Sequence, residues 1–289
     1  MAVHLAMLLQ SLLSAGTYLA AKRALADLSP FEIALFRFAL AGAFYAALWR
    51  WSGVRIARRD LLALAGLGVL AIPVNQGFFL YGMSLTTPGH GALLYALAPV
   101  FVFLFARWRL GERATRLKIA GVALAFAGVV VVLAGRGAVA VGLDVAARGL
   151  LGDLLVLVAV LAWSVFAVAG KPYAERYGVL ASTGAAIAAG SAVYLPFGFA
   201  MSDLSAFGRA TAGAWSSILY LALLQSVLAY LLYYWALRRS EASRVAIWSN
   251  TQPVLAAALS WALYGEPVTG TFALGGAMVI GGVVLTERG

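Results

Sequence analysis

The sequence contains no cysteine and only two histidines, His4 and His90. Without thiols the chain can form no disulfide, zinc–thiolate site or iron–sulfur cluster. Two histidines leave little room for another kind of metal site or for a Ser-His-Asp triad. The stretch "GKPYAERYG" also lacks the upstream glycine of a phosphate-binding loop. We therefore expect no metal, no cofactor and no ATP-driven step.

Charged residues are also scarce, at 11% of the chain, whereas soluble domains carry about 25%. Hydrophobic residues make up 63% of the 289 positions, and the mean hydropathy is +0.93. Such a chain cannot cover a water-facing surface, so the composition predicts an all-α membrane protein with spans of about 20 apolar residues. Ten transmembrane helices are expected, at 3–22, 31–50, 61–82, 88–107, 117–135, 150–170, 179–200, 214–237, 243–264 and 268–286.

The basic residues indicate the orientation of these helices. The net charge is +10, but the Lys and Arg residues cluster in short loops, as in membrane proteins and unlike a nucleic-acid-binding surface. With the N-terminus inside, the cytoplasmic segments hold Arg50, Arg55, Arg58, Arg59, Arg107, Arg109, Arg113, Arg116, Lys118, Lys171, Arg176, Arg238, Arg239, Arg244 and Arg288. Both termini are therefore predicted to be cytoplasmic. The first apolar run lacks the basic region of a signal peptide, so we expect it to stay as a span.

One pattern occurs twice in the chain. The stretch "ALAPVFVFLFARWRLGE" (96–112) returns 154 residues later as "NTQPVLAAALSWALYGE" (250–266), with the same spacing from proline to Gly-Glu. Nearer the start of each half, "SAGTYLAAK" (14–22) is similar to "WSVFAVAGK" (163–171). The offset of 154 residues also aligns two further glycine pairs, Gly121 with Gly275 and Gly128 with Gly282. The sequence therefore predicts an internal repeat of five helices.

An odd number of spans in each copy places the second copy upside down in the membrane. The predicted division is residues 1–137, an external linker at 138–149, and residues 150–289. The loops agree, because the chain around Glu112 reads "RWRLGERATRLK" and is strongly basic, whereas "YGEPVTG" around Glu266 has no basic residue. Inverted repeats are the usual architecture of secondary transporters, whose binding site lies near the membrane midplane between the repeats.

These motifs resemble those of the drug/metabolite transporter superfamily, in its EamA-type branch of ten-span exporters. The resemblance rests on the repeated pattern that ends in Lys, on the repeated Pro…Gly-Glu, and on Arg37-Phe38 in "ALFRFALAG", and it covers residues 5–286. It implies a multi-pass protein of the bacterial inner membrane, and bacterial members such as the YddG type export amino acids. The chain departs from exact repetition at Ser14, where the second half has Trp163.

Polar and aromatic side chains near the middle of several spans are the candidates for a substrate site. In the ninth span Trp248 and Gln252 are four residues apart and share a helix face, with Asn250 between them. Amides in hydrocarbon are costly unless they are partnered, so these should face the protein interior. Each could instead bond a neighbouring helix without touching a ligand. The expected substrate-binding residues are Trp163, Tyr95, Trp248, Asn250, Gln252, Gln76 and His90.

Pro99 and Pro253 are the candidate hinges, because proline removes a helical hydrogen bond and kinks a helix. The alternative is a kink that serves packing alone. Gly111-Glu112 and its repeat are interpreted as helix terminators, with glycine ending one helix and glutamate favouring the N-terminus of the next. Arg37 lies about 10 Å into the bilayer by helical rise, where it either pairs with a protein group or attracts a substrate carboxylate.

These features predict a secondary transporter that exports small metabolites by alternating access. Aromatic or neutral amino acids are favoured, because a lining of aromatic and neutral polar groups suits a zwitterion. The alternative is a multidrug or quaternary-amine exporter of the same fold, which commonly relies on a mid-membrane carboxylate that this sequence lacks. A membrane enzyme would need clustered acids or histidines, so we expect no enzymatic activity. The expected partners are a small-molecule substrate and membrane lipids but no nucleic acid; proton coupling or facilitated diffusion, and monomer or homodimer, are left open.

Overall fold

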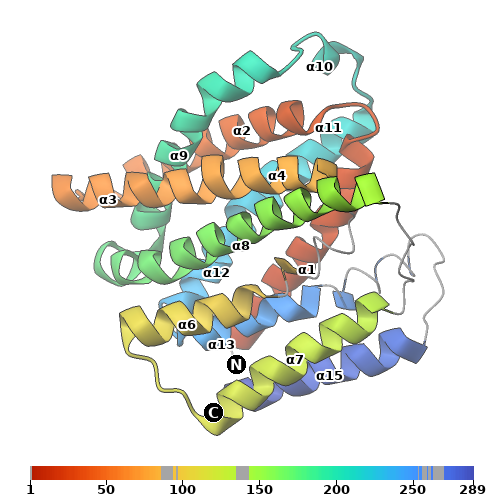
Figure 1. Cartoon of the computed structure of the whole chain (residues 1–289). Coiled ribbons are helices and arrows are strands. Elements are labelled where there is room, and N and C mark those ends of the chain that lie inside the picture. Colours follow the sequence, from red (N-terminus) through yellow and green to blue (C-terminus); the bar gives the residue numbers. More distant parts are fainter. Residues whose placement is uncertain are drawn as a thin grey trace. The chain divides into compact units, whose positions relative to one another are not determined.

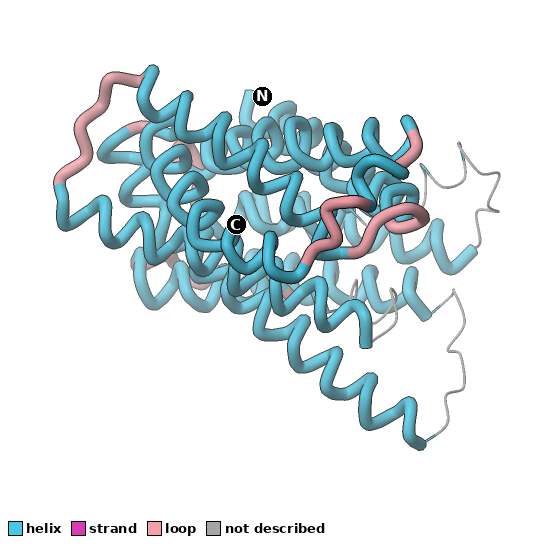
Figure 2. Tube along the Cα trace, turned by 90° about the horizontal axis from the view of Figure 1, so that it is seen from above, coloured by secondary structure: helices cyan, strands magenta, loops and turns pink. Residues whose placement is uncertain are grey.

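The structure, a computed structural model, describes residues 2–85, 94–95, 97–134, 143–252, 254–255, 259, 262 and 270–289. Within these residues all regular structure is helical, as Figure 2 shows. The prediction of an all-helical chain is thereby confirmed. His90, Pro253 and the second Gly-Glu pair, Gly265-Glu266, lie outside the described residues.

The chain divides into two compact units, which are described separately. The first unit comprises Met1–Gln76 and Ala169–Arg239, and the second comprises Gly77–Val168 and Ser240–Gly289. Each unit draws helices from both halves of the sequence, so the units do not coincide with the predicted repeats. The division into two five-helix repeats stays a prediction.

The helices are labelled in Figure 1. Those of the first unit are α1 (Ala2–Ala24), α2 (Pro30–Trp51), α3 (Arg58–Val69), the π-helix η1 (Leu70–Val74), α9 (Val179–Met201), α10 (Ala206–Arg209), α11 (Ala212–Leu219), the π-helix η2 (Tyr220–Ala229) and α12 (Tyr230–Leu237). Those of the second unit are α4 (Asn75–Leu85), which begins in the first unit, α6 (Ala98–Leu110), α7 (Arg116–Ala134), α13 (Ala242–Ile247), the 3-10 helix η3 (Trp248–Asn250) and α15 (Gly270–Arg288). The long helix α8 (Leu143–Tyr177) contributes residues to both units.

Five helical stretches of the described residues are long and apolar enough to cross a membrane. They are Pro30–Trp51, Arg58–Phe79, Leu150–Tyr177, Val179–Met201 and Ala212–Leu237. They follow the apolar runs of the sequence, because a continuous helix satisfies its backbone hydrogen bonds internally and hydrocarbon cannot. The number of ten spans and the side on which the termini lie stay predictions.

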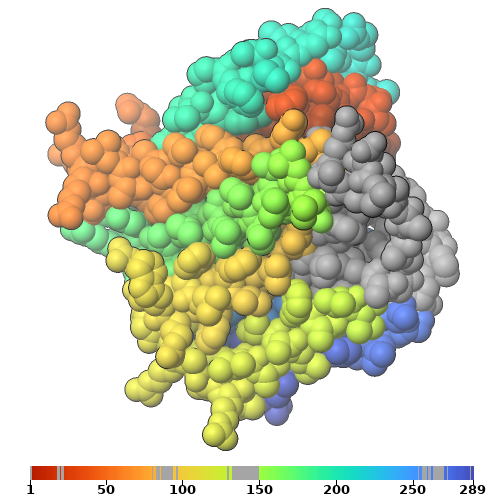
Figure 3. Space-filling model, viewed as in Figure 1, coloured from red at the N-terminus to blue at the C-terminus, as the bar shows by residue number. Residues whose placement is uncertain are grey.

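In the first unit, α2 and α3 both pack against α9, and Figure 3 shows the side chains of α2 and α9 lying against each other. The contacts depend on small residues. A Cβ at Gly42 would lie 2.5 Å from the Cβ of Ser191, and one at Gly184 would lie 2.9 Å from the backbone oxygen of Tyr45. In a membrane the hydrophobic effect does little to hold helices together, so this close approach supplies van der Waals contact instead.

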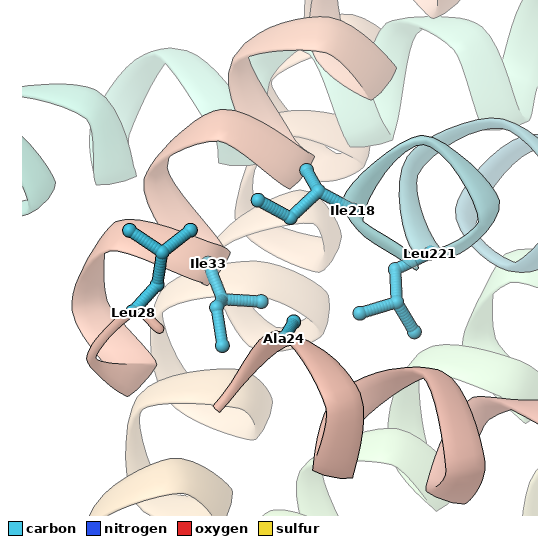
Figure 4. Close-up of a cluster of buried hydrophobic side chains, with 5 residues drawn as sticks. All are labelled: Ala24, Leu28, Ile33, Ile218 and Leu221. Carbon is cyan, nitrogen blue, oxygen red and sulfur yellow. The ribbon is translucent and has the colours of Figure 1, made fainter. Parts of the chain in front are cut away.

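The turn between α1 and α2 packs against α11 and η2. The apolar cluster that joins them consists of Ala24, Leu28, Ile33, Ile218 and Leu221 (Figure 4). Beside it the Asp27 carboxylate accepts hydrogen bonds from the hydroxyl of Thr211 at 2.6 Å and from its N–H at 2.8 Å. These bonds hold the pKa of Asp27 below its usual value. Ser29 and Glu32 form a capping box at the start of α2, and the other oxygen of Glu32 accepts from the N–H of Asp203.

Two π-helical stretches interrupt long helices of the first unit. In η1 the ring of Pro73 removes a backbone donor, which is a common cause of helix irregularity. No proline lies in η2, where the Ser226 hydroxyl donates to the carbonyl of Leu221 at 2.9 Å and Tyr45 donates to the carbonyl of Val227 at 3.0 Å. π-Helical turns often mark functional regions, and only the first of these two had a signal in the sequence.

In the second unit, α7 and α15 lie side by side along most of their length (Figure 1). A Cβ at Gly121 would lie 2.7 Å from the backbone oxygen of Gly282, and a Cβ at Gly128 would lie 2.6 Å from that of Gly275. The two helices therefore run antiparallel. The predicted repeat aligns Gly121 with Gly275 and Gly128 with Gly282. Gly121 therefore packs against the repeat equivalent of Gly128, and Gly128 packs against the repeat equivalent of Gly121. Two copies related by a two-fold axis would pack in this way.

Gly68 and Gly66 offer a matched test of close helix packing. A Cβ at Gly68 would lie 1.8 Å from the backbone oxygen of Ala186, whereas a Cβ at Gly66 would meet nothing within 4 Å. We expect Gly68→Ala to destabilise the protein by about 1–3 kcal/mol through overpacking, and Gly66→Ala to stabilise it slightly, by about 0.5–1 kcal/mol. Thermal unfolding in detergent measures both, and equal melting temperatures for the two variants would contradict the contact between α3 and α9.

Candidate functional site

The second unit contains most of the candidate lining residues. Tyr95 and Trp163 both pack against one buried apolar cluster, which consists of Ala98, Val156 and Val160. Each ring also has an aromatic neighbour. Phe79 lies edge-on to Tyr95 with 5.3 Å between ring centroids, and Phe166 lies tilted against Trp163 at 5.6 Å. The cluster therefore brings together two candidates that are far apart in the sequence.

Trp248 lies in η3 and packs against a second apolar cluster. That cluster consists of Val122 and Ala125 of α7, Ile247 of α13 and Val283 of α15. Val100 of α6 packs against it as well, while Ala98, two residues earlier, belongs to the cluster that holds Tyr95 and Trp163. The first turn of α6 is thus the shared neighbour of all three aromatic candidates.

Pro99 is buried in this first turn of α6. The sequence predicts a kink at Pro99 inside a continuous fourth span, and α6 begins one residue before this proline, at Ala98. Proline is favourable at such a position because the first N–H groups of a helix have no intrahelical acceptor. The expected kink of the fourth span stays a prediction. The hinge role of Pro99 stays a prediction, and Pro253 lies outside the described residues.

Asn250 has the most unusual environment of the candidates. It is the last residue of η3 and is 1% exposed. Neither its amide oxygen nor its amide nitrogen has a hydrogen-bond partner within the described part of the chain. An unpartnered buried amide costs about 1–3 kcal/mol, and such groups in native proteins call for an explanation such as a functional role. Gln252, two residues further on, is half-buried.

Gln76 is buried at the start of α4, as the last residue of the first unit. Its amide nitrogen donates to the side-chain oxygen of Asn75 at 2.6 Å. The structure therefore gives Gln76 a local partner. His90, the remaining candidate, lies outside the described residues.

The first unit contains a series of side-chain hydrogen bonds whose residues are not among the candidates chosen from the sequence. Gln10 donates to Ser14 Oγ at 2.9 Å, and Ser14 donates to Gln225 Oε1 at 3.2 Å. The next residue, Ser226, accepts a hydrogen bond from Arg37 Nε at 2.7 Å. Arg37 therefore has a protein partner, which is one of the two roles expected of it. The signal for Gln225 and Ser226 is an amide and a hydroxyl inside the apolar run of η2.

The first Gly-Glu pair confirms one prediction and corrects another. Gly111 ends α6 in the left-handed conformation, with φ +70°, and its N–H bonds to the carbonyl of Ala106, as expected of a terminator. The buried carboxylate of Glu112, however, accepts hydrogen bonds from the N–H groups of Ala242 and Ser243 and from the hydroxyl of Ser243. Glu112 thus caps the start of α13, because the free N–H groups of any helix attract a carboxylate and the fold brings α13 to it.

An ion pair ties the same end of α13 to α7. The side chain of Lys118 is 1% exposed and contacts Glu241 Oε2, which also accepts from Arg244 Nε at 3.0 Å. Burial by itself would raise the pKa of the Glu241 carboxyl. The hydrogen bond and charge of Lys118, aided by Arg244, outweigh this effect and hold the pKa of Glu241 below its usual value.

Replacing Glu241 by Gln should lower the melting temperature near neutral pH, and this loss should shrink as the pH falls below 4.5. The pKa of Glu241 is lower in the folded protein than in the unfolded chain. The ionised carboxylate therefore stabilises the protein at pH values above the unfolded pKa, and this stabilisation is lost as the pH falls through the folded pKa. Thermal unfolding between about pH 3 and 7 measures the difference. Glu175→Gln, at an exposed side chain, is the control, and a Glu241→Gln effect that is the same at every pH would contradict the prediction.

Comparison with known proteins agrees with this architecture. The model of the EamA-like transporter family matches two stretches of the chain, residues 1–134 and 150–288. The chain belongs to the EamA-like transporter family. It is therefore an integral membrane protein of the drug/metabolite transporter superfamily, and the resemblance in the repeated motifs is confirmed.

Relatives of this EamA-like protein are named as transporters. An uncharacterized transporter of Archaeoglobus fulgidus is 30% identical over 98% of this chain and 96% of its own. A probable terminal-alkyne amino-acid exporter of Streptantibioticus cattleyicolor is 34% identical over 82% of this chain and 76% of its own. One solved crystal structure has the same fold, with a TM-score of 0.83 at 20% identity over 99% of this chain and 96% of that one.

The candidate residues combine aromatic surface with neutral polar groups. Tyr95, Trp163 and Trp248 provide aromatic surface, and Asn250 provides a neutral donor and acceptor. Among the described residues no group of three or more His, Asp or Glu side chains could hold a metal ion. This chemistry suits binding and release, in keeping with a transporter family.

Proposed function

We propose that this protein is a secondary transporter that exports aromatic or other neutral amino acids across the bacterial inner membrane by alternating access. The family match establishes the coarser statement, that the chain is a membrane transporter of the EamA-like family. The finer one rests on the neutral and aromatic character of the candidate site. It is also supported by the relative of Streptantibioticus cattleyicolor, which is named as a probable amino-acid exporter.

The observation that carries this proposal is the unpartnered amide of Asn250. A carboxamide presents one acceptor and one donor group side by side, which complement the ammonium and carboxylate groups of an amino acid. The tryptophan and tyrosine rings that adjoin α6 would accept an apolar or aromatic side chain. Binding sites for small molecules generally combine such apolar walls with a few polar groups that fix orientation.

Alternating access is supported by two signs of internal symmetry. The family model matches each half of the chain separately, and the aligned glycines of α7 and α15 contact each other crosswise. In transporters built from inverted repeats, one repeat moves against the other around a fixed site and so exposes that site to each side in turn. Pro99 and Pro253 remain the proposed hinges of this movement.

Counterflow in proteoliposomes tests the proposed substrate class. Vesicles that contain the purified protein are loaded with one unlabelled amino acid, and uptake of a labelled tracer is followed with and without an imposed pH gradient. We expect saturable exchange of aromatic and neutral amino acids, and a several-fold loss in the Trp163→Ala and Gln252→Ala variants. Exchange of no amino acid, together with binding of lipophilic cations, would support the multidrug alternative instead.

Asn250 and Asn75 provide a matched pair for the binding role, since both are buried and each is 1% exposed. Asn250→Leu removes an amide that has no partner among the described residues. It should therefore raise the unfolding free energy by about 1 kcal/mol while counterflow falls at least about tenfold. Asn75→Leu removes the acceptor of the Gln76 amide and should lower stability. Melting temperatures and counterflow on the same preparations measure both. If Asn250→Leu retains full exchange, the site does not include this residue.

A further inference from the structure

We infer that Glu112 is a positioning residue for the proposed substrate site, because its carboxylate fixes the start of the short helical segment that carries Asn250. This segment, the α13–η3 segment, comprises α13 and η3 together. The inference rests on the proposed function only in that Asn250 is taken to contact the substrate. The placement of the segment itself follows from contacts within the second unit.

Both oxygens of the Glu112 carboxylate accept hydrogen bonds at the start of α13. One oxygen accepts from the N–H of Ala242, and the other accepts from the N–H of Ser243 at 3.3 Å and from its hydroxyl at 2.5 Å. Both N–H groups belong to the first turn of α13 and have no acceptor within their own helix. The residue before the helix, Glu241, makes no side-chain cap of its own. The cap of α13 is therefore supplied from the distant turn after α6.

The cap fixes the first turn of α13. Its six residues lead directly into η3, so the anchored first turn is the start of the whole segment. Asn250 follows Ala242 by eight positions, or about 12 Å of helical rise. Since no hydrogen bond from the described residues holds the Asn250 amide, we take its position to depend on the packing of η3 and on the anchored start of α13.

The contact between Lys118 and Glu241 acts at the same end of the segment but in a different way. It joins side chains at the start of α7 and α13, and it leaves the N–H groups of the first turn to Glu112. Loss of Glu112 therefore leaves two buried backbone donors and one hydroxyl without their acceptor, whereas loss of Glu241 leaves the cap intact. The two residues should differ in their effect on the site and resemble each other in their effect on stability.

A thiol reporter tests the placement of the segment without reference to any substrate. The chain has no cysteine, so Ser249→Cys introduces a single reporter beside Asn250. In this background Glu112→Ala should raise the rate of labelling by a small maleimide about tenfold, the factor that corresponds to loss of a helix cap. Glu112→Gln keeps one acceptor oxygen and should give an intermediate rate. Glu175→Gln should leave the rate unchanged.

A double-variant cycle identifies the bond responsible. Ser243→Ala removes the hydroxyl that donates to Glu112, so it should raise the labelling rate moderately on its own. Added to Glu112→Ala it should raise the rate no further, because the interaction is already lost. Additive effects of the two substitutions would show that they act on different contacts, and would overturn the assigned cap.

Counterflow in the natural Ser249 background then separates positioning from a purely structural role. Glu112→Ala should raise the KM for the exchanged amino acid about tenfold, with the maximal rate per folded copy nearly unchanged, and Glu241→Gln should leave KM unchanged. Unaltered labelling in Glu112→Ala overturns the inference, and so does faster labelling with an unaltered KM. If labelling increases but the natural protein exchanges no amino acid, Glu112 still positions η3 and the proposed substrate class is wrong.

Discussion

Hydrocarbon offers no hydrogen-bond partner, so the polar groups of a membrane helix must be satisfied within the protein. This constraint is sharpest at helix ends, where several N–H and C=O groups have no partner in the helix. The described structure meets it with side chains from distant segments. Glu112 caps α13, and Glu32 caps its own helix and bonds the backbone of Asp203 as well.

The same constraint applies to the buried amide of Asn250. Inside the first unit, the buried side chains of Gln10 and Ser14 bond to each other, and Ser14 also bonds to Gln225. Asn250 is also buried, and neither of its amide atoms has a partner among the residues that the structure describes. An unmet amide is expensive in such an environment, and the proposed function accounts for it by assigning the Asn250 amide to the substrate.

The two ends of the α13–η3 segment differ in how they are held. Its start is held by a carboxylate with three donors and by a neighbouring ion pair, while its end carries an unsatisfied amide. A transporter must bind a substrate firmly enough for selectivity and release it after the conformational change. In the proposed mechanism, a rigidly held backbone sets the position of Asn250 before the substrate arrives.

The apolar runs of the sequence determined the all-helical architecture and most helix positions, since a run of about 20 apolar residues has few alternatives to a helix. The repeated motifs determined the family, and a glycine before a polar turn determined the end of α6 at Gly111. Only the tertiary structure decided that Glu112 caps α13 and not the following helix, that Arg37 bonds Ser226, and that Pro99 lies in the first turn of α6. Tyr95 and Trp163 could be chosen as candidates from the sequence, but their shared cluster at α6 could not be derived from it. Sequence periodicity reports which side chains avoid water, whereas the partner of a buried polar group depends on which helices the fold places side by side.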